Sequence, residues 1–369
     1  MKIHPLLRDP NAVLSFRRPP GRPVHWDDFR RAAFEAMQAM QIELEDEKAA
    51  IKPNVTSGER LADPDTGITT HPGFIHGLVE YLAAHGAPPR RVTVIEDPRD
   101  TDDNAPRSWT GTGYDRLAEL TGVRLHTPNT YTCVKKPVAQ PQVRHRVNVS
   151  RLAAAPGTVL INVPKLKTHN LAVTTLGMKN LMGLVNVFER HYCLEAWEEL
   201  PAEIRDNPNP RREWFEEWMH AAWQLGLARR LVDTAQALPP ALTVIEGVVG
   251  REGTGFQRGQ NLPLGLVIAG VNIVAVDSLA SYVMGFDPRE LVYLKLAAAC
   301  GLGQNAVEKL RVYTVEQGEL VACPDLATLR VDPPFRAIRN VKDEPTIAFE
   351  TQDPAAIDPS DTFFGRSHA

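Results

Sequence analysis

Four basic side chains surround one apolar segment of the chain. Lys165, Lys167 and His169 follow an apolar run, and Lys179 is then the only charged residue in the stretch from 171 to 187. A helix that is apolar on all sides is a buried helix, and an unpaired ammonium is costly to bury. Lys179 must therefore meet a carboxylate, a ligand anion or a water-filled cavity. Because free N–H groups at a helix start also favour negative charge, these residues predict an anion site.

A structural ion pair is the alternative explanation for Lys179. Its counterion would then be Glu246 or Asp277. In the functional interpretation, a desolvated lysine near other cations has a lowered pKa and can act in acid–base or electrostatic catalysis. We expect the catalytic residues to be Lys179, His191 and Glu246, with the last two assisting proton transfer.

Polar residues also end several apolar, β-branched runs, namely AAIKPN, VTVIED, VLINVPK and LTVIEG. Ligands of open parallel sheets bind beyond the carboxyl ends of the strands. We therefore expect Glu96, Asn162 and Glu246 to share one cleft with neighbouring lysines, although strand ends also turn polar simply on leaving the core. The predicted substrate-binding residues are Lys52, Asn54, His71, Lys165, Lys167, His169 and Asn180.

Helices and strands must alternate to position these residues. Apolar patterns predict helices at 26–42, after Pro72, and at 211–236. The last of these is rich in tryptophan (Trp214, Trp218 and Trp223), so it predicts either core packing or a homodimer contact. The alternation predicts an α/β fold, a mostly parallel sheet with helices on both faces, built as one large domain or as two intimately packed α/β lobes.

The expected organisation has three parts. An N-terminal helical arm covers 1–44, and an α/β core domain covers 45–325. The core would divide, if it has two lobes, at about 45–150 and 151–325. A Pro/Asp-rich tail follows at 326–369 and is expected to wrap loosely around the core.

Composition excludes several classes of protein. The 369 residues carry a formal net charge of -4, which gives no general attraction to nucleic acid or to an anionic membrane. No run of about 18 apolar residues predicts a membrane span, and the first residues lack the apolar region of a signal peptide. The four cysteines are dispersed, so we expect no intrinsic iron–sulfur cluster. The sequence thus predicts a cytoplasmic protein.

A divalent metal is a candidate cofactor. Its ligands would come from His169, His191, Glu252 and Asp277, none of which lies at the spacing of a tight metal motif. Two of them also have a structural alternative, because His191 could be a surface residue after a helix and Asp277 could cap a helix. The glycine-rich segment GREGTGFQRG lacks the G-K-[ST] ending of a phosphate-binding loop.

Several motifs together resemble the domain of unknown function 362 family. These are VPKLKTH, TLGMKNLMG and the pair Arg190 and His191, with IKPN, TTHP, VIEGVVGREGTG and VAVDSLASYVMG, between about Ile51 and Gly303. Many members of that family carry a ferredoxin-like module with clustered cysteines, which this sequence lacks. The resemblance therefore implies a separate electron carrier if the chemistry is redox. More distantly, the arrangement is similar to the lactate racemase family, α/β enzymes that hold a nickel-pincer nucleotide through a lysine and a histidine.

The sequence as a whole predicts an enzyme that acts on a small anionic substrate, a carboxylate or a phosphate. Lysine and histidine would supply acid–base chemistry, and the reaction would be an isomerisation or an elimination, with or without a metal. Two alternatives stay open. One is a non-catalytic protein that binds or delivers an anionic ligand or cofactor, and the other is a redox enzyme working with a separate electron carrier.

Overall fold

Short β-branched runs in the middle of the chain form the parallel part of one large sheet. The computed structural model describes residues 1–55, 67–98, 109–128, 130–200, 202, 217–255 and 259–337. Five strands lie side by side in the order β10-β7-β2-β3-β4, and every pairing among them is parallel. Their bounds are β2 (Lys48–Pro53), β3 (Val92–Ile95), β4 (Arg124–His126), β7 (Thr158–Val163) and β10 (Leu242–Arg251).

The rest of the 11-stranded sheet is mixed. Beyond β10 the order continues β11-β1-β12-β13, in which only β1 and β12 pair in parallel. A side branch is formed by β8, which pairs in parallel with β10 and antiparallel with β9. These strands are β1 (Ala12–Arg17), β8 (Lys165–His169), β9 (Val173–Thr175), β11 (Asn261–Gly270), β12 (Arg311–Glu316) and β13 (Glu319–Ala322). The predicted α/β fold with a mostly parallel sheet is confirmed.

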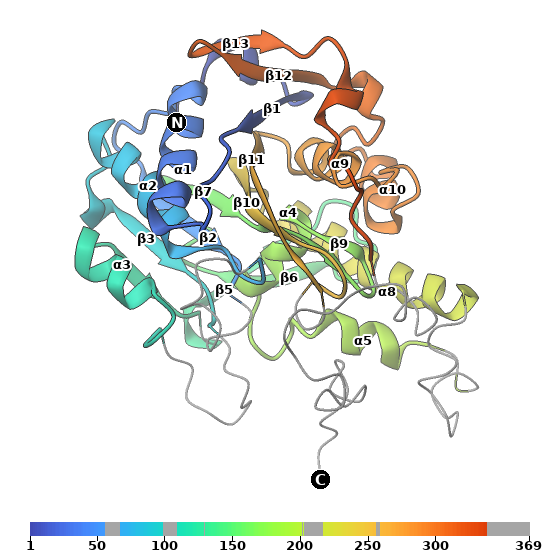
Figure 1. Ribbon diagram of the computed structural model, residues 1–369. Coiled ribbons are helices and arrows are strands. Elements are labelled where there is room, and N and C mark those ends of the chain that lie inside the picture. The colour runs from blue at the N-terminus through green and yellow to red at the C-terminus, as the bar shows by residue number, and fades with distance from the viewer. Residues whose placement is uncertain are drawn as a thin grey trace.

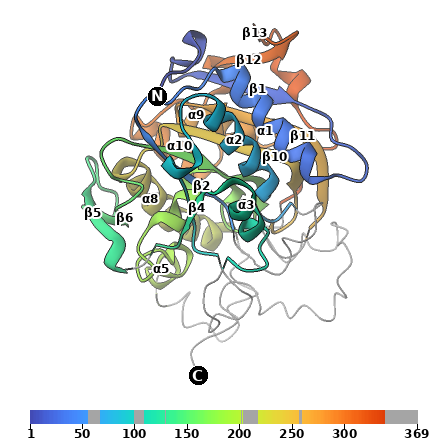
Figure 2. The ribbon, with the colours of Figure 1, turned by 90° about the vertical axis from the view of Figure 1, so that its left-hand side faces the viewer.

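Helices cover both faces of this sheet (Figure 1). Alternate residues of β2 show why: Ala49 and Ile51 pack in the apolar core of one face, and Ala50 packs in that of the other. The first face carries α1 (Trp26–Met40), α2 (Pro72–Ala84) and α3 (Tyr114–Thr121), which lie toward the viewer in Figure 2. The second carries α4 (Gly177–Asn180), α5 (Tyr192–Glu198), α8 (Glu217–Ala237), α9 (Ile273–Val283) and α10 (Val292–Ala299).

Two terminal segments differ from their predicted roles. Residues 1–44 do not form a helical arm, because the apolar run at β1 inserts between β11 and β12 as part of the sheet. The first residues of the predicted tail pack firmly, with Leu329 and Phe335 buried against α9 and its surroundings. The segment 338–369 lies outside the described residues. One continuous sheet also runs across the boundary at 150/151, where two lobes were considered.

In the predicted tryptophan-rich helix, Trp223 is the one tryptophan whose side chain the structure describes, and it packs against other residues of the same chain. Trp223 donates from its Nε1 to the carbonyl of Cys193 at 2.7 Å and stacks edge-on against Trp197. Trp214 and the side chain of Trp218 lie outside the described residues, so the homodimer stays a prediction. None of the helices in the described part of the chain combines the length and the hydropathy needed to traverse a bilayer.

A separate two-stranded sheet flanks the second face. It consists of β5 (Cys133–Pro137) and β6 (Arg146–Ser150), which pair antiparallel. Its connecting turn is held by the buried carboxylate of Asp233 on α8, which accepts the backbone N–H groups of residues 142, 143 and 144 at 2.7–2.9 Å. The hairpin is therefore anchored to the helix layer.

The contact between α1 and α2 gives a direct test of the packing. A Cβ added to Gly77 would overlap the carbonyl oxygen of Arg30 and come within 2.9 Å of the Ala33 Cβ. Gly77→Ala should therefore lower the free energy of unfolding by about 1–3 kcal/mol, measured by urea denaturation. Ala83→Ser, at an exposed position of α2, should change it little. An unchanged stability in Gly77→Ala would mean that the two helices are farther apart.

Candidate functional site

Lys165 and Glu246 form a fully buried ion pair where β8 runs beside β10. The two residues are register partners, and Lys165 Nζ lies 2.5 Å from Glu246 Oε2. The same Oε2 accepts the His71 N–H, and Oε1 accepts the N–H groups of Val248 and Val249. A carboxylate offers about four acceptor positions. Glu246 thus has no position left for a substrate proton, which argues against its predicted role in proton transfer.

His71 is a helix cap beside this pair. Its Nδ1 accepts the Gly73 N–H at 3.0 Å, and its ring stacks on Phe29 with 3.9 Å between centroids. Burial, followed by the positive charge of Lys165, lowers the pKa of His71 to about 3. The imidazole is therefore neutral at physiological pH, and the cap explains its place better than anion binding does.

Lys52 is the centre of a second buried network, at the end of β2. Its Nζ donates to Glu96 Oε2 at 2.6 Å and to Asn180 Oδ1 at 3.1 Å. The Asn180 amide in turn donates to the Lys52 carbonyl and to Asn162 Oδ1. Burial lowers the pKa of Lys52, and the charge of Glu96 opposes that shift. The structure thus brings together the predicted residues Lys52 and Asn180.

Two residues at this network were not among the predicted site residues. Glu96 was expected to share the cleft with the lysines but was given no role there, although the acidic pair in VIED was the available signal. Gly183 covers the ion pair, because a Cβ there would lie 2.6 Å from Lys52 Cε and 2.8 Å from Lys52 Nζ. The next carboxylate, Asp97, pairs with the guanidinium of Arg190. The ends of β2, β3 and β7 are thus joined by hydrogen bonds and covered by backbone.

The segment after β9 is not the single buried helix that its apolar sequence predicted. It forms the one-turn helix α4 and then the 3₁₀ helix η4 (Leu181–Leu184). The Asn162 amide donates to the Gly177 carbonyl at 3.0 Å, and Asp277 accepts the N–H groups of Gly177 and Met178 at 2.7 and 2.9 Å. These bonds to strand and helix side chains fix the short turn in place of regular helix.

Lys179, in that turn, is only partly buried. Neither carboxylate considered as its counterion serves that purpose, because Glu246 pairs with Lys165 and Asp277 accepts two backbone N–H groups. Burial raises the pKa of Asp277 to about 7, against the effect of those two hydrogen bonds.

Lys167 is buried on β8, two positions after Lys165. Its buried Nζ donates to Asn54 Oδ1 at 2.9 Å and to the Ile68 carbonyl at 2.7 Å. Burial is the main reason why the pKa of Lys167 lies well below its ordinary value. The positive charges of Lys179, Arg251 and Lys165 lower this pKa further, in that order, while Glu96 acts in the opposite direction.

The two other predicted histidines have different surroundings. His169 is buried at the end of β8, where its Nδ1 accepts the N–H groups of Leu171 and Ala172 at 3.0 and 3.2 Å. His191 is exposed and precedes α5. The neighbouring Arg190, rather than His191, reaches the strand ends through its pair with Asp97.

The candidate metal ligands do not converge. In the part of the chain that the structure describes, no three His, Cys, Asp or Glu side chains come together as a metal site would require. Glu252 pairs with Arg336 at 2.6 Å. His169 and Asp277 accept backbone N–H groups, as described above.

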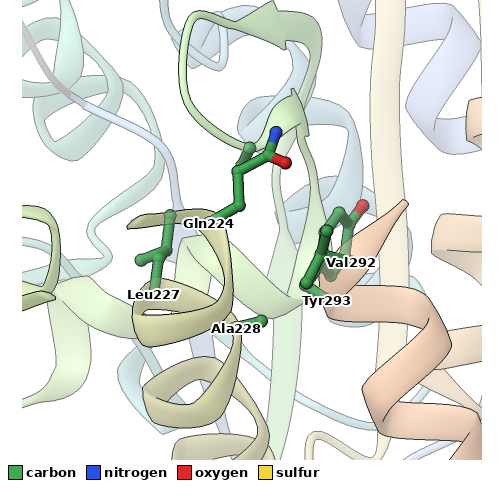
Figure 3. A pocket seen from close by; sticks show the side chains of 6 residues that line it. Gln224, Leu227, Ala228, Val292 and Tyr293 are labelled. Carbon is green, nitrogen blue, oxygen red and sulfur yellow. The ribbon is translucent and has the colours of Figure 1, made fainter. Parts of the chain in front are cut away.

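A small cavity lies between α8 and α10 (Figure 3). Gln224 and Tyr293 supply its polar groups, and the space suffices for about one water molecule. The Gln224 amide donates to the Leu171 carbonyl at 2.6 Å, and the Tyr293 hydroxyl bonds to Thr174 at 2.9 Å. The cavity is thus a packing gap behind β9 rather than a substrate pocket.

A family model described as Domain of unknown function (DUF362) matches residues 49–282. The chain belongs to this family. A thylakoid-associated protein of Synechocystis sp. is 29% identical over 150 residues, which are 41% of this DUF362 chain and 40% of that relative. The aligned part thus spans less than half of the relative's length.

Two solved structures resemble this DUF362 protein at 12% sequence identity. One is a protein of Thermotoga maritima, with a TM-score of 0.39 over 76% of this chain and 61% of that chain. The other is the lactate racemase apoprotein of Thermoanaerobacterium thermosaccharolyticum, with a TM-score of 0.37 over 72% of this chain and 56% of that chain. Similarity at this level supports no functional argument.

The Lys165–Glu246 ion pair predicts how the free energy of unfolding changes when one or both of its charges are removed. Lys165→Met leaves the Glu246 carboxylate buried without its cation, so the free energy of unfolding should fall by about 3–5 kcal/mol in urea denaturation. Lys165→Met combined with Glu246→Gln removes both charges and should recover much of that loss. If Lys165 instead faced a solvent-filled ligand cleft, the single variant would keep nearly full stability.

His71 predicts how the stability of the protein depends on pH. Its pKa is lowered in the folded state from 6.5 to about 3, so its contribution is complete above pH 6.5 and is lost as the pH falls toward 3. His71→Asn keeps a capping side chain without a titrating group. From pH 7 to 5 the native protein should lose about 2 kcal/mol more than this variant, measured by urea denaturation at both pH values. Equal losses would show that His71 takes up its proton in the folded state.

Proposed function

We propose that this DUF362 protein is an enzyme that binds a small anionic substrate, a carboxylate or a phosphate, beside the carboxyl ends of its central strands. Lys167 would exchange a proton with this substrate, and Lys179 and Arg251 would attract its negative charge. The proposal differs from the sequence-based one in its central residue, since Lys167 replaces Lys179 as the acid–base group.

The environment of Lys167 carries the proposal. An amine with a lowered pKa is neutral in a larger fraction of the molecules than an ordinary lysine, and only the neutral amine can accept a proton. The same positive charges that lower its pKa, those of Lys179 and Arg251, would favour an anion nearby. A guanidinium such as that of Arg251 also suits the paired oxygens of a carboxylate or phosphate.

An anion bound there would change the protonation of Lys167. Its negative charge would stabilise the ammonium form and raise the lysine pKa. Binding would therefore be accompanied by proton uptake, and the affinity should increase as the pH is lowered through the pKa of free Lys167. Simple electrostatic binding to ordinary, permanently charged lysines would show neither effect.

The prediction concerns inorganic phosphate and succinate as probes of the two anion classes. Isothermal titration calorimetry in two buffers of different ionisation enthalpy should show binding of at least one probe with proton uptake. Lys167→Met should weaken that binding at least about tenfold, or about 1.4 kcal/mol, and abolish the uptake. Binding of neither probe, or equal binding by Lys167→Met, would contradict the proposal.

Lys309→Met is the matched control, because Lys309 is exposed and carries the same charge away from the strand ends. It should leave the affinity unchanged. Catalysis is distinguished from sequestration by following deuterium incorporation beside the carboxylate of bound succinate in D₂O. Exchange that depends on Lys167 supports the enzyme, and binding without exchange favours the alternative of a non-catalytic carrier.

A further inference from the structure

Asp277 holds the turn that carries Lys179. Asp277 lies on α9, and its two carboxylate oxygens accept the N–H groups of Gly177 and Met178, at 2.7 and 2.9 Å. The residue after this pair is Lys179, and α4 ends at Asn180. A carboxylate with both oxygens bonded to successive N–H groups fixes the position and the direction of that backbone.

The fit between Asp277 and the turn is close. A Cβ on Gly177 would lie 2.7 Å from Asp277 Oδ1, 2.9 Å from Ile273 Cγ1 and 3.1 Å from Thr243 Cγ2. The turn therefore contacts α9 and β10 at a position that favours glycine. On its other side, the Gly177 carbonyl accepts the Asn162 amide. The backbone before Lys179 is thus held by side chains of two separate elements.

Lys179 in turn acts on Lys167. Among the charges that lower the pKa of Lys167, that of Lys179 has the largest effect. Since electrostatic effects fall with distance, the size of this effect depends on where α4 places the Lys179 side chain.

We propose that Asp277 is a positioning residue, which holds Lys179 beside Lys167 through its hydrogen bonds to the N–H groups of Gly177 and Met178. Asp277 itself touches no substrate in this proposal. The proposal rests on the function suggested above only for the importance of Lys167, and its test needs no ligand.

The charge of Asp277 also acts on a neighbouring titratable group. The titratable group that it influences from the neighbouring α10 is Tyr293, whose pKa is raised well above its ordinary value by burial and then by Asp277. The Tyr293 hydroxyl bonds to Thr174 on β9. Thr243 on β10 and Ile273 on α9 approach from the remaining sides and bring no charge.

The test is the titration of Lys167 in the ligand-free protein, followed by NMR on protein labelled with ¹³C and ¹⁵N in lysine. Lys167 is assigned from its loss in Lys167→Met. Lys179→Met should raise the midpoint of Lys167, because it removes a neighbouring positive charge. Asp277→Asn should raise it in the same direction, by no more than Lys179→Met, because an amide can accept only one of the two N–H groups and its NH₂ opposes the other.

Asp233→Asn is the matched control. Asp233 is also a fully buried carboxylate that accepts successive backbone N–H groups, but its bonds hold the β5–β6 turn. This variant should lose stability and leave the Lys167 midpoint unchanged. A Lys167 midpoint in folded Asp277→Asn that stays as low as in the native protein, or an unchanged midpoint in Lys179→Met, would overturn the proposal.

A measurement on the native protein covers the case in which Asp277→Asn does not fold. The pKa of Asp277 is about 7, so the amide resonances of Gly177 and Met178 should shift together with a midpoint close to that pH. The side-chain nitrogen of Lys179 should follow with the same midpoint. If the amides titrate and the Lys179 nitrogen does not, Asp277 does not control the lysine and the proposal fails. Phosphate and succinate are absent throughout, so this failure is distinct from a failure of anion binding.

Discussion

Removing lysine side chains from water is the constraint on which the centre of this molecule depends. Lys52, Lys165 and Lys167 stand on β2 and β8, and none is more than 3% exposed. Burial is the largest cause of a lowered pKa at each of them. Each amine therefore needs oxygen atoms around it before the strands can pack. Strand register and the loops at the strand ends supply those oxygens.

The three lysines differ in the described oxygens that they contact and in the charges that shift their pKa values. The carboxylates of Glu96 and Glu246 stabilise the charged forms of Lys52 and Lys165. Lys167, two positions from Lys165 on the same strand, donates to an amide oxygen and a backbone carbonyl, which are neutral. Burial and the positive charges of Lys179, Arg251 and Lys165 lower the pKa of Lys167. The same sheet can therefore hold two lysines as structural ions and keep the third close to a change of charge.

The sequence was sufficient for the fold class and for the gathering of polar side chains at strand ends. Both follow from β-branched runs that end in lysine, asparagine or glutamate, and parallel strands bring such ends together. The ion pair of Lys165 with Glu246 was not predicted, because Lys165 was expected to bind a substrate anion and the strand β8, which pairs with β10, was not expected. The strand at 12–17 was missed because six residues before a strong helix signal give little periodicity.

The roles of individual residues could not be read in the same way. Glu246 looked like a proton acceptor in the sequence, and only the four hydrogen bonds to its oxygens show that its acceptor positions are occupied. Similarly, the apolar stretch after 171 predicted a helix, since sequence patterns do not record that Asp277 and Asn162 would bind the backbone at Gly177. Apart from the bonds that Val248 and Val249 donate to Glu246, these contacts join residues at least 15 positions apart, which periodicity does not encode.

The backbone at Gly183 seals the Lys52–Glu96 pair, and this has a consequence for ionic strength. Mobile ions weaken interactions between charges that water surrounds, but they reach a covered pair poorly. Added salt should therefore act on exposed pairs such as Arg289 with Asp287 and leave the frame of the strand ends intact. A salt dependence seen in anion binding would then report on the binding site itself, with little contribution from loosening of the sheet around it.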